Sequence, residues 1–101
     1  MNLFDEMLPG RQVTQVCFVH DYLQVVFGDM CLTINSRYEF IGAEGKDFID
    51  EIVEKTLTSD DAFTLVFSQG RKLKVGIANE DYHSPEAMVL SSEEIPMIVW
   101  N

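Results

Sequence analysis

The stretch that decides the fold is YLQVVFGDMCLTI, residues 22–34. On either side of Gly28-Asp29 it is rich in β-branched and aromatic residues, and apolar side chains alternate along it, which is typical of strands that bury one face. Glycine supplies the positive φ angle that a tight turn between two strands requires. The stretch therefore predicts a β-hairpin formed by Tyr22–Phe27 and Met30–Ile34.

Segments of similar composition precede and follow this hairpin. Further strands are expected at Val13–His20, Tyr38–Ile41, Ala62–Phe67, Lys72–Ile77, Ala87–Leu90 and Met97–Trp100. Ala62–Phe67 and Lys72–Ile77 form a second predicted hairpin, with glycine in the turn between them. Because side chains alternate along a strand, Leu73, Val75 and Ile77 would face the core and Lys72, Lys74 and Gly76 would face the other way.

The segment 45–57 has a different periodicity. Its apolar residues recur at helical spacing, at Phe48, Ile49, Ile52, Val53 and Leu57. Its acidic residues fall together on the opposite side of a helical wheel, at Asp47, Asp50, Glu51 and Glu54. This pattern predicts one amphipathic α-helix.

The whole pattern predicts a single domain over residues 1–101 of the α+β class, mostly β. We expect an antiparallel β-sandwich or half-barrel of about seven to eight short strands, with the helix covering a face or an end. Residues 1–10 are expected to be a loosely ordered N-terminal segment. A chain of 101 residues is too short for a second hydrophobic core.

Composition excludes several classes of protein. No stretch approaches the roughly 18 to 20 consecutive apolar residues that span a bilayer, so we expect no membrane partner. Residues 1–10 lack the features of a signal peptide, which favours a cytoplasmic location. Cys17 and Cys31 lie in strand-like segments, where buried free thiols are expected; a single bridge between neighbouring strands stays open as an alternative.

Residues that carry out catalysis or bind metals are sparse. The only histidines are His20 and His83, and no spacing typical of a zinc site is present. A nucleophile beside an oriented histidine is not indicated, since residues 17 and 20 of one strand point to opposite faces. The glycines are too scattered for a phosphate-binding loop. We therefore expect no enzyme, no catalytic residue, no metal and no cofactor.

Charge is the strongest functional signal. Seventeen acidic residues against seven basic ones give a net charge of −10 at pH 7. Such a protein disfavours nucleic acid and anionic membranes and favours cationic partners. Solubility alone also explains an acidic surface, and that interpretation stays open. If the acids do bind a partner, the expected binding residues are Asp47, Asp50, Glu51, Glu54, Asp60, Asp61, Glu80, Asp81 and Tyr82.

The order of elements resembles small bacterial immunity proteins, including those of contact-dependent growth inhibition systems. The resemblance covers residues 13–100 and is carried by the hairpin 23–34, the predicted helix after it, the hairpin 65–75, and Tyr82 and the run 86–90 before a terminal strand. Members of such families bind and neutralise a cognate toxin, often a basic nuclease, in the cytosol of the producing cell. The resemblance implies this role, and the position of the binding residues comes from the charge pattern.

Together these observations favour an immunity protein that is a monomer and binds one basic toxin domain. A ribonuclease is favoured over a deoxyribonuclease as the toxin. It would cover the active-site or substrate-binding surface of the toxin with carboxylates. A small adaptor or structural subunit that acts through self-association or hetero-oligomer formation is the alternative. An acidic mimic of nucleic acid, which would bind many unrelated basic proteins, is a third class.

Overall fold

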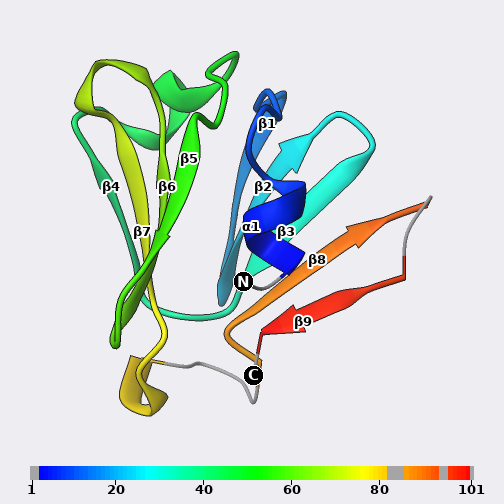
Figure 1. Cartoon of the computed structure of the whole chain (residues 1–101), viewed down its shortest axis with the longest axis vertical. Helices are drawn as coiled ribbons and strands as arrows, with labels where there is room; N and C mark the ends of the chain where they lie inside the picture. Colours follow the sequence, from blue (N-terminus) through cyan, green and yellow to red (C-terminus); the bar gives the residue numbers. More distant parts are fainter. Residues whose placement is uncertain (1–2, 82–85, 94–95, 101) are drawn as a thin grey trace.

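The computed structural model describes residues 3–81, 86–93 and 96–100. Its strands form two antiparallel sheets that face each other across the core (Figure 1). One sheet has five strands in the order β1-β2-β3-β8-β9, and the other has four in the order β4-β7-β6-β5. The predicted α+β, mostly β fold is confirmed, and of the two architectures left open the sandwich is the one found.

The elements have the following bounds. The five-stranded sheet contains β1 (Gln15–Val19), β2 (Tyr22–Phe27), β3 (Met30–Ile34), β8 (Met88–Ser92) and β9 (Ile98–Trp100). The four-stranded sheet contains β4 (Tyr38–Ile41), β5 (Lys55–Thr58), β6 (Ala62–Val66) and β7 (Lys72–Gly76). The helical elements are α1 (Leu3–Met7) and the 3-10 turns η1 (Gly45–Phe48), η2 (Ser68–Gly70) and η3 (Asn79–Asp81).

The hairpin of residues 22–34 forms as the sequence predicts. β2 and β3 pair antiparallel with Phe27 opposite Met30, and Gly28 adopts a φ of 68° in the turn between them. Buried and half-buried residues alternate along both strands, so one face of each strand points into the core. In β7 the alternation is equally regular, with Leu73 and Val75 buried and Lys72 and Lys74 exposed.

The predicted amphipathic helix over residues 45–57 is wrong. Only η1 is helical there, and β5 begins at Lys55. The helical turn ends because Ile49 is extended, with a ψ of 135°, and Asp50 has a φ of 76°. Of the apolar residues that suggested the helix, Phe48 and Val53 are buried, whereas Ile49, Ile52 and Leu57 are at least 39% exposed.

Backbone pairing with distant segments explains why the helix does not form. The amide of Val53 donates to the Arg11 carbonyl at 2.9 Å, and the Val53 carbonyl accepts from the Gly10 amide at 2.7 Å. The Glu54 amide then donates to Val66 on β6 at 2.8 Å. These hydrogen bonds satisfy the backbone groups that a helix would have paired internally, and β-branched residues such as Ile52 and Val53 suit extended backbone.

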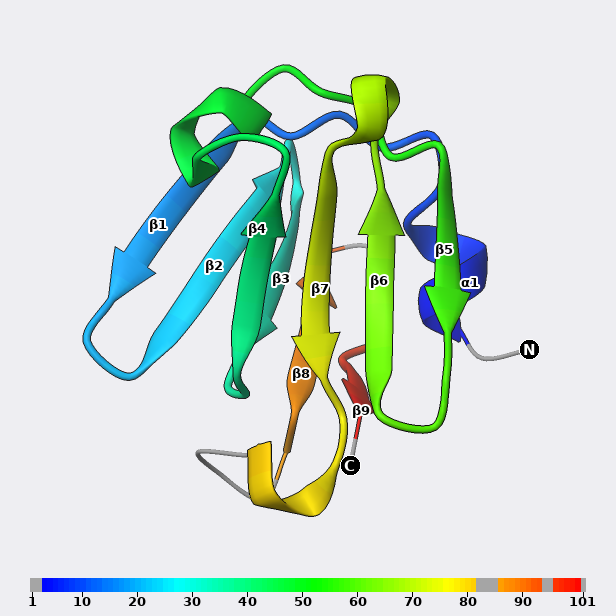
Figure 2. The same ribbon diagram turned by 90° about the vertical axis from the view of Figure 1, so that its left-hand side faces the viewer.

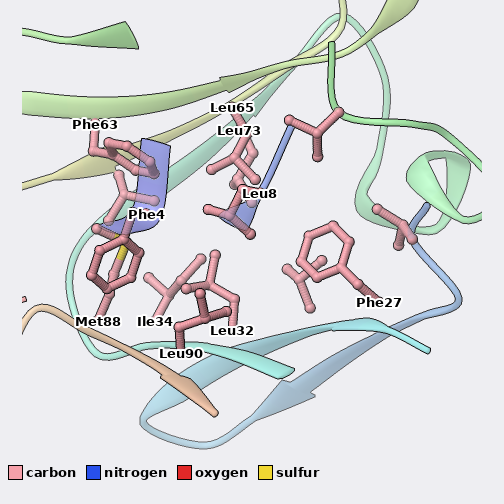
Figure 3. Packing of buried hydrophobic residues seen from close by; sticks show 14 of the residues in the cluster. Phe4, Leu8, Phe27, Leu32, Ile34, Phe63, Leu65, Leu73, Met88 and Leu90 are labelled. Carbon is pink, nitrogen blue, oxygen red and sulfur yellow. The ribbon is translucent and has the colours of Figure 1, made fainter. Parts of the chain in front are cut away.

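The core lies between the two sheets and draws on both (Figure 3). Leu32, Ile34 and Leu90 from the five-stranded sheet meet Leu65 and Leu73 from the four-stranded sheet, and all of them are at most 1% exposed. Stacked sheets lie about 10 Å apart, which is the thickness of two interdigitated layers of side chains. The inner faces therefore supply most of the burial that stabilises the fold.

The N-terminal segment, expected to be loosely ordered, contributes to this core in residues 3–8. α1 packs beside β5, and Phe4 of α1 and Leu8, which directly follows it, lie in the interior at 2% and 0% exposure. The Phe4 ring meets Phe63 with centroids 6.0 Å apart and Trp100 with centroids 5.3 Å apart. Since Phe63 lies on β6 and Trp100 on β9, this aromatic cluster joins α1 to both sheets.

We predict that Leu8→Ala lowers the free energy of unfolding by about 2–5 kcal/mol, because it leaves a cavity in the core. Leu3→Ala is the matched control: the same substitution at the first residue of α1, where the side chain is 51% exposed, should cost about 0.5 kcal/mol or less. Urea denaturation measures both. Equal effects of the two variants would mean that residues 3–8 are not part of the cooperative core.

Candidate functional site

The predicted partner-binding residues do not form one surface. Asp47, Asp50 and Glu51 lie at the end of the sandwich where β7 begins. Asp60, Asp61, Glu80 and Asp81 lie at the other end, where β7 finishes. Figure 2 shows η1 and η3 at these opposite ends. Glu54 lines a shallow hollow beside β5 with Asp5 and Lys55, and Tyr82 lies outside the described residues.

Acids at the first end are used inside the molecule. The Glu51 carboxylate accepts a hydrogen bond from the Ser68 hydroxyl at 2.8 Å and lies 3.6 Å from the Arg71 guanidinium. The Asp47 carboxylate accepts from the Glu44 amide at 3.2 Å, which caps η1, and the Asp47 carbonyl accepts from Arg71 at 3.2 Å. These contacts hold the segment after β4 against the start of β7. Asp50 and Glu54 remain exposed.

The second end is hollowed into a pocket of about 560 Å³, named here the acidic pocket. It is lined by Arg37, Tyr38, Glu39, Asp61, Lys74, Gly76, Ala78, Glu80 and Asp81. The start of β4 and the end of β7 form one side, and η3 forms the other. Three of the predicted binding residues therefore meet here. Asp61 lies about twenty residues before the other two, Glu80 and Asp81.

Backbone hydrogen bonds fix the walls of the acidic pocket. The Arg37 amide donates to the Asp81 carbonyl at 3.0 Å, and the Gly76 amide donates to the Arg37 carbonyl at 2.8 Å. The buried Ser36 hydroxyl, 1% exposed as a residue, lies 2.6 Å from the Gly76 carbonyl and 3.0 Å from the Asp81 carbonyl and shares its proton between them. Ser36 thus ties η3 to the end of β7.

Gly76 permits the close approach of η3. A Cβ atom on Gly76 would meet the Asp81 side chain well inside van der Waals contact. Any larger residue would push the Asp81 carboxylate out of its position, where it is 15% exposed and 3.5 Å from the Arg37 guanidinium. The absence of a side chain at position 76 therefore helps to shape the acidic pocket.

Negative charge predominates in the acidic pocket. Four carboxylates line it against the cations Arg37 and Lys74, so the formal charge is −4 plus 2, or −2. Arg37 pairs with Asp81, and Glu39 lies opposite Lys74 across β4 and β7. Glu39 and Glu80 are exposed, and neither takes part in an ion pair among the described residues. Their carboxylates are available to a cationic group from outside.

Sequence reasoning missed Glu39, Arg37 and Ser36. The alternation of β4 contained a signal for Glu39, because it places that residue on the opposite face from Tyr38 and Phe40. No local pattern identified Ser36, since its hydrogen-bond partners Gly76 and Asp81 are 40 and 45 residues further along the chain.

The remaining candidate groups for chemistry are dispersed. His20 lies 3.6 Å from Asp21 on an exposed turn, with its side chain 94% exposed. Within residues 3–81, 86–93 and 96–100, no group of three metal-ligating side chains forms. Cys17 and Cys31 are free thiols. The register places them on non-adjacent strands, Cys17 opposite Gln24 and Cys31 opposite Val26.

Comparison with known proteins found no matching family model, no matching curated protein and no matching solved structure. In the described part of the chain, no helix combines the length and the apolar character that crossing a bilayer requires.

We predict that Ser36→Ala lowers the free energy of unfolding by about 1–3 kcal/mol, because the Gly76 and Asp81 carbonyls lose their shared donor. The Arg37 amide, which bonds to Asp81, should exchange its hydrogen faster as η3 loosens. Ser91→Ala is the control, since the hydroxyl of Ser91 makes only a 3.5 Å contact with the Cys31 carbonyl. Denaturation and amide exchange by NMR measure both; unchanged exchange at Arg37 would contradict the proposed role of Ser36.

Proposed function

We propose that this protein is an immunity-type inhibitor that binds a cationic toxin domain and neutralises it by covering its active-site or substrate-binding surface. A ribonuclease is favoured over a deoxyribonuclease as the toxin. The observation that carries the proposal is the acidic pocket, where Glu39 and Glu80 present carboxylates outside the ion pairs of the described residues. The net charge of −10 points to the same class of partner. On this proposal the protein binds and has no turnover of its own.

The chemistry of nucleases makes them suitable partners. A surface that holds a phosphate backbone is rich in arginine and lysine, and a carboxylate that takes the place of a phosphate can accept charge-assisted hydrogen bonds from them. The acidic pocket, at about 560 Å³, has room for an arginine or lysine side chain of the toxin. Gly76 and the buried Ser36 hold the pocket in shape, so little ordering of the inhibitor is needed on binding.

Long-range attraction adds to this local fit. Carboxylates lie at both ends of the sandwich, and the summed field of a protein with a charge of −10 attracts a basic domain from a distance. Such steering raises the association rate and falls with ionic strength. The two contributions are separable, because steering depends on the total charge and the fit depends on which carboxylates remain.

The experiment begins with the reading frame immediately upstream, which on this proposal ends in a basic C-terminal domain. We predict that this protein binds that domain one to one and abolishes its ribonuclease activity. In the double variant Glu39→Gln/Glu80→Gln the dissociation constant should rise by about tenfold or more, mainly through faster dissociation, because charge-assisted contacts at the pocket are lost. Surface plasmon resonance and an RNA cleavage assay measure the two effects.

Asp50→Asn/Glu54→Gln is the matched control, with the same change in total charge on exposed residues away from the acidic pocket. It should slow association slightly and leave dissociation unchanged. Equal losses in both double variants would show that total charge matters and the pocket does not. Equal affinity for unrelated basic proteins would favour a nucleic-acid mimic, and failure to bind or inhibit the neighbouring domain would refute the immunity role.

A further inference from the structure

The five-stranded sheet has an outer face without charge. No Asp, Glu, Lys or Arg occurs anywhere in β1, β2, β3, β8 or β9. One row of outward-facing residues crosses all five strands in register, and it consists of Cys17, Gln24, Thr33, Val89 and Val99. The outward-facing residues of this sheet are named here the neutral face.

The other sheet shows what a solvated outer face looks like in this protein. Its outward residues include Lys72 and Lys74 on β7, Lys55 on β5 and Glu39 on β4. The contrast is marked in a chain with 24% charged residues. Depletion of charge distinguishes the centre of an interface from ordinary protein surface, so the neutral face has the character of a docking surface.

We propose that the neutral face binds the neutral face of a second copy of this chain. A chain with a charge of −10 repels its own copies, and contact between copies is least unfavourable where both surfaces lack charge. The Gln24 amide donates to the Thr33 hydroxyl at 3.5 Å, and the two groups keep further donors and acceptors for a partner. Under two-fold symmetry such a surface complements itself, whereas a cationic partner gains nothing from it.

The geometry suits a modest interface. Five strands about 4.8 Å apart and about five residues long cover a flat area of roughly 24 by 17 Å, or about 400 Å² before side-chain relief. Stable interfaces bury about 800 Å² of accessible surface per partner, so the dimer should be weak. Two such sheets can stack face to face at the usual small angle.

Acidic residues surround the neutral face and determine how salt acts. Asp21 and Asp29 lie in the turns that flank β2, and Glu93 follows β8; all three are exposed. A second copy brings its own acids near these, and salt screens that repulsion. Dimerisation should therefore strengthen with salt, whereas binding to a basic toxin should weaken. The acidic pocket belongs to the other sheet and stays open in this dimer, so this inference is independent of the proposed function.

The test is sedimentation equilibrium of the full chain from 10 μM to 1 mM protein, at low and at high NaCl, roughly a tenfold range in ionic strength. We expect a monomer–dimer equilibrium that tightens by several-fold at high salt. Thr33→Glu, at the centre of the neutral face, should raise the dissociation constant by at least tenfold. A protein that stays monomeric over the whole range at both salt concentrations would overturn the proposal.

Thr64→Glu is the matched control. Thr64 is also half-buried, faces outward from the inner strand β6 of the other sheet, and gains the same charge on substitution. It should leave the dissociation constant unchanged, and an effect equal to that of Thr33→Glu would overturn the proposal. Far-ultraviolet circular dichroism and urea denaturation establish that both variants fold.

The unmodified protein offers a second measurement that does not depend on any variant. Cys17 and Cys31 are free, half-buried thiols on the neutral face. Their reaction with a thiol reagent should slow several-fold as the protein concentration rises through the dissociation constant measured by sedimentation. A rate that is independent of concentration across that range would place the thiols outside any interface and overturn the proposal.

Discussion

The burial of two inner sheet faces is the constraint on which the rest of this structure depends. Because alternate residues of a strand point to opposite faces, a register shift of one residue in β7 would expose Leu73 and Val75 and bury Lys72 and Lys74. Burying an unpaired ammonium group costs several kcal/mol. The register is therefore strongly determined, and every outward residue takes its position from it.

The inner faces also decide where charge can lie. Of the two sheets, only the four-stranded one carries ionisable Lys or Glu side chains within its strands. The remaining carboxylates of the described chain lie in α1, in turns and in connections, and most of those between strands lie at the ends of the sandwich. The acidic pocket and the neutral face are thus two results of one arrangement of strands.

Much of the fold was predictable because its signals are local. The alternation in residues 22–34 and a glycine with positive φ identify the first hairpin without any knowledge of its neighbours. β5 was missed because five apolar residues between positions 48 and 57 together recur at helical spacing, although only Phe48 and Val53 among them are buried. What decides against the helix is pairing of residues 50–54 with residues 10–13 and Val66, which local periodicity does not record.

The candidate site was predictable only in part. Acid content singled out Asp61, Glu80 and Asp81, which the structure brings together in the acidic pocket. It equally singled out Glu51, whose carboxylate contacts Ser68 and Arg71 inside the molecule. The sequence does not distinguish an acidic residue that faces solvent from one that stabilises a loop. The difference lies in contacts with residues that are distant in the chain. The connections that bear the pocket's acids, around Asp61 and η3, lie outside the alternating strands, so substitutions in them can alter the shape and charge of the pocket while the sandwich persists through successive generations of sequence change.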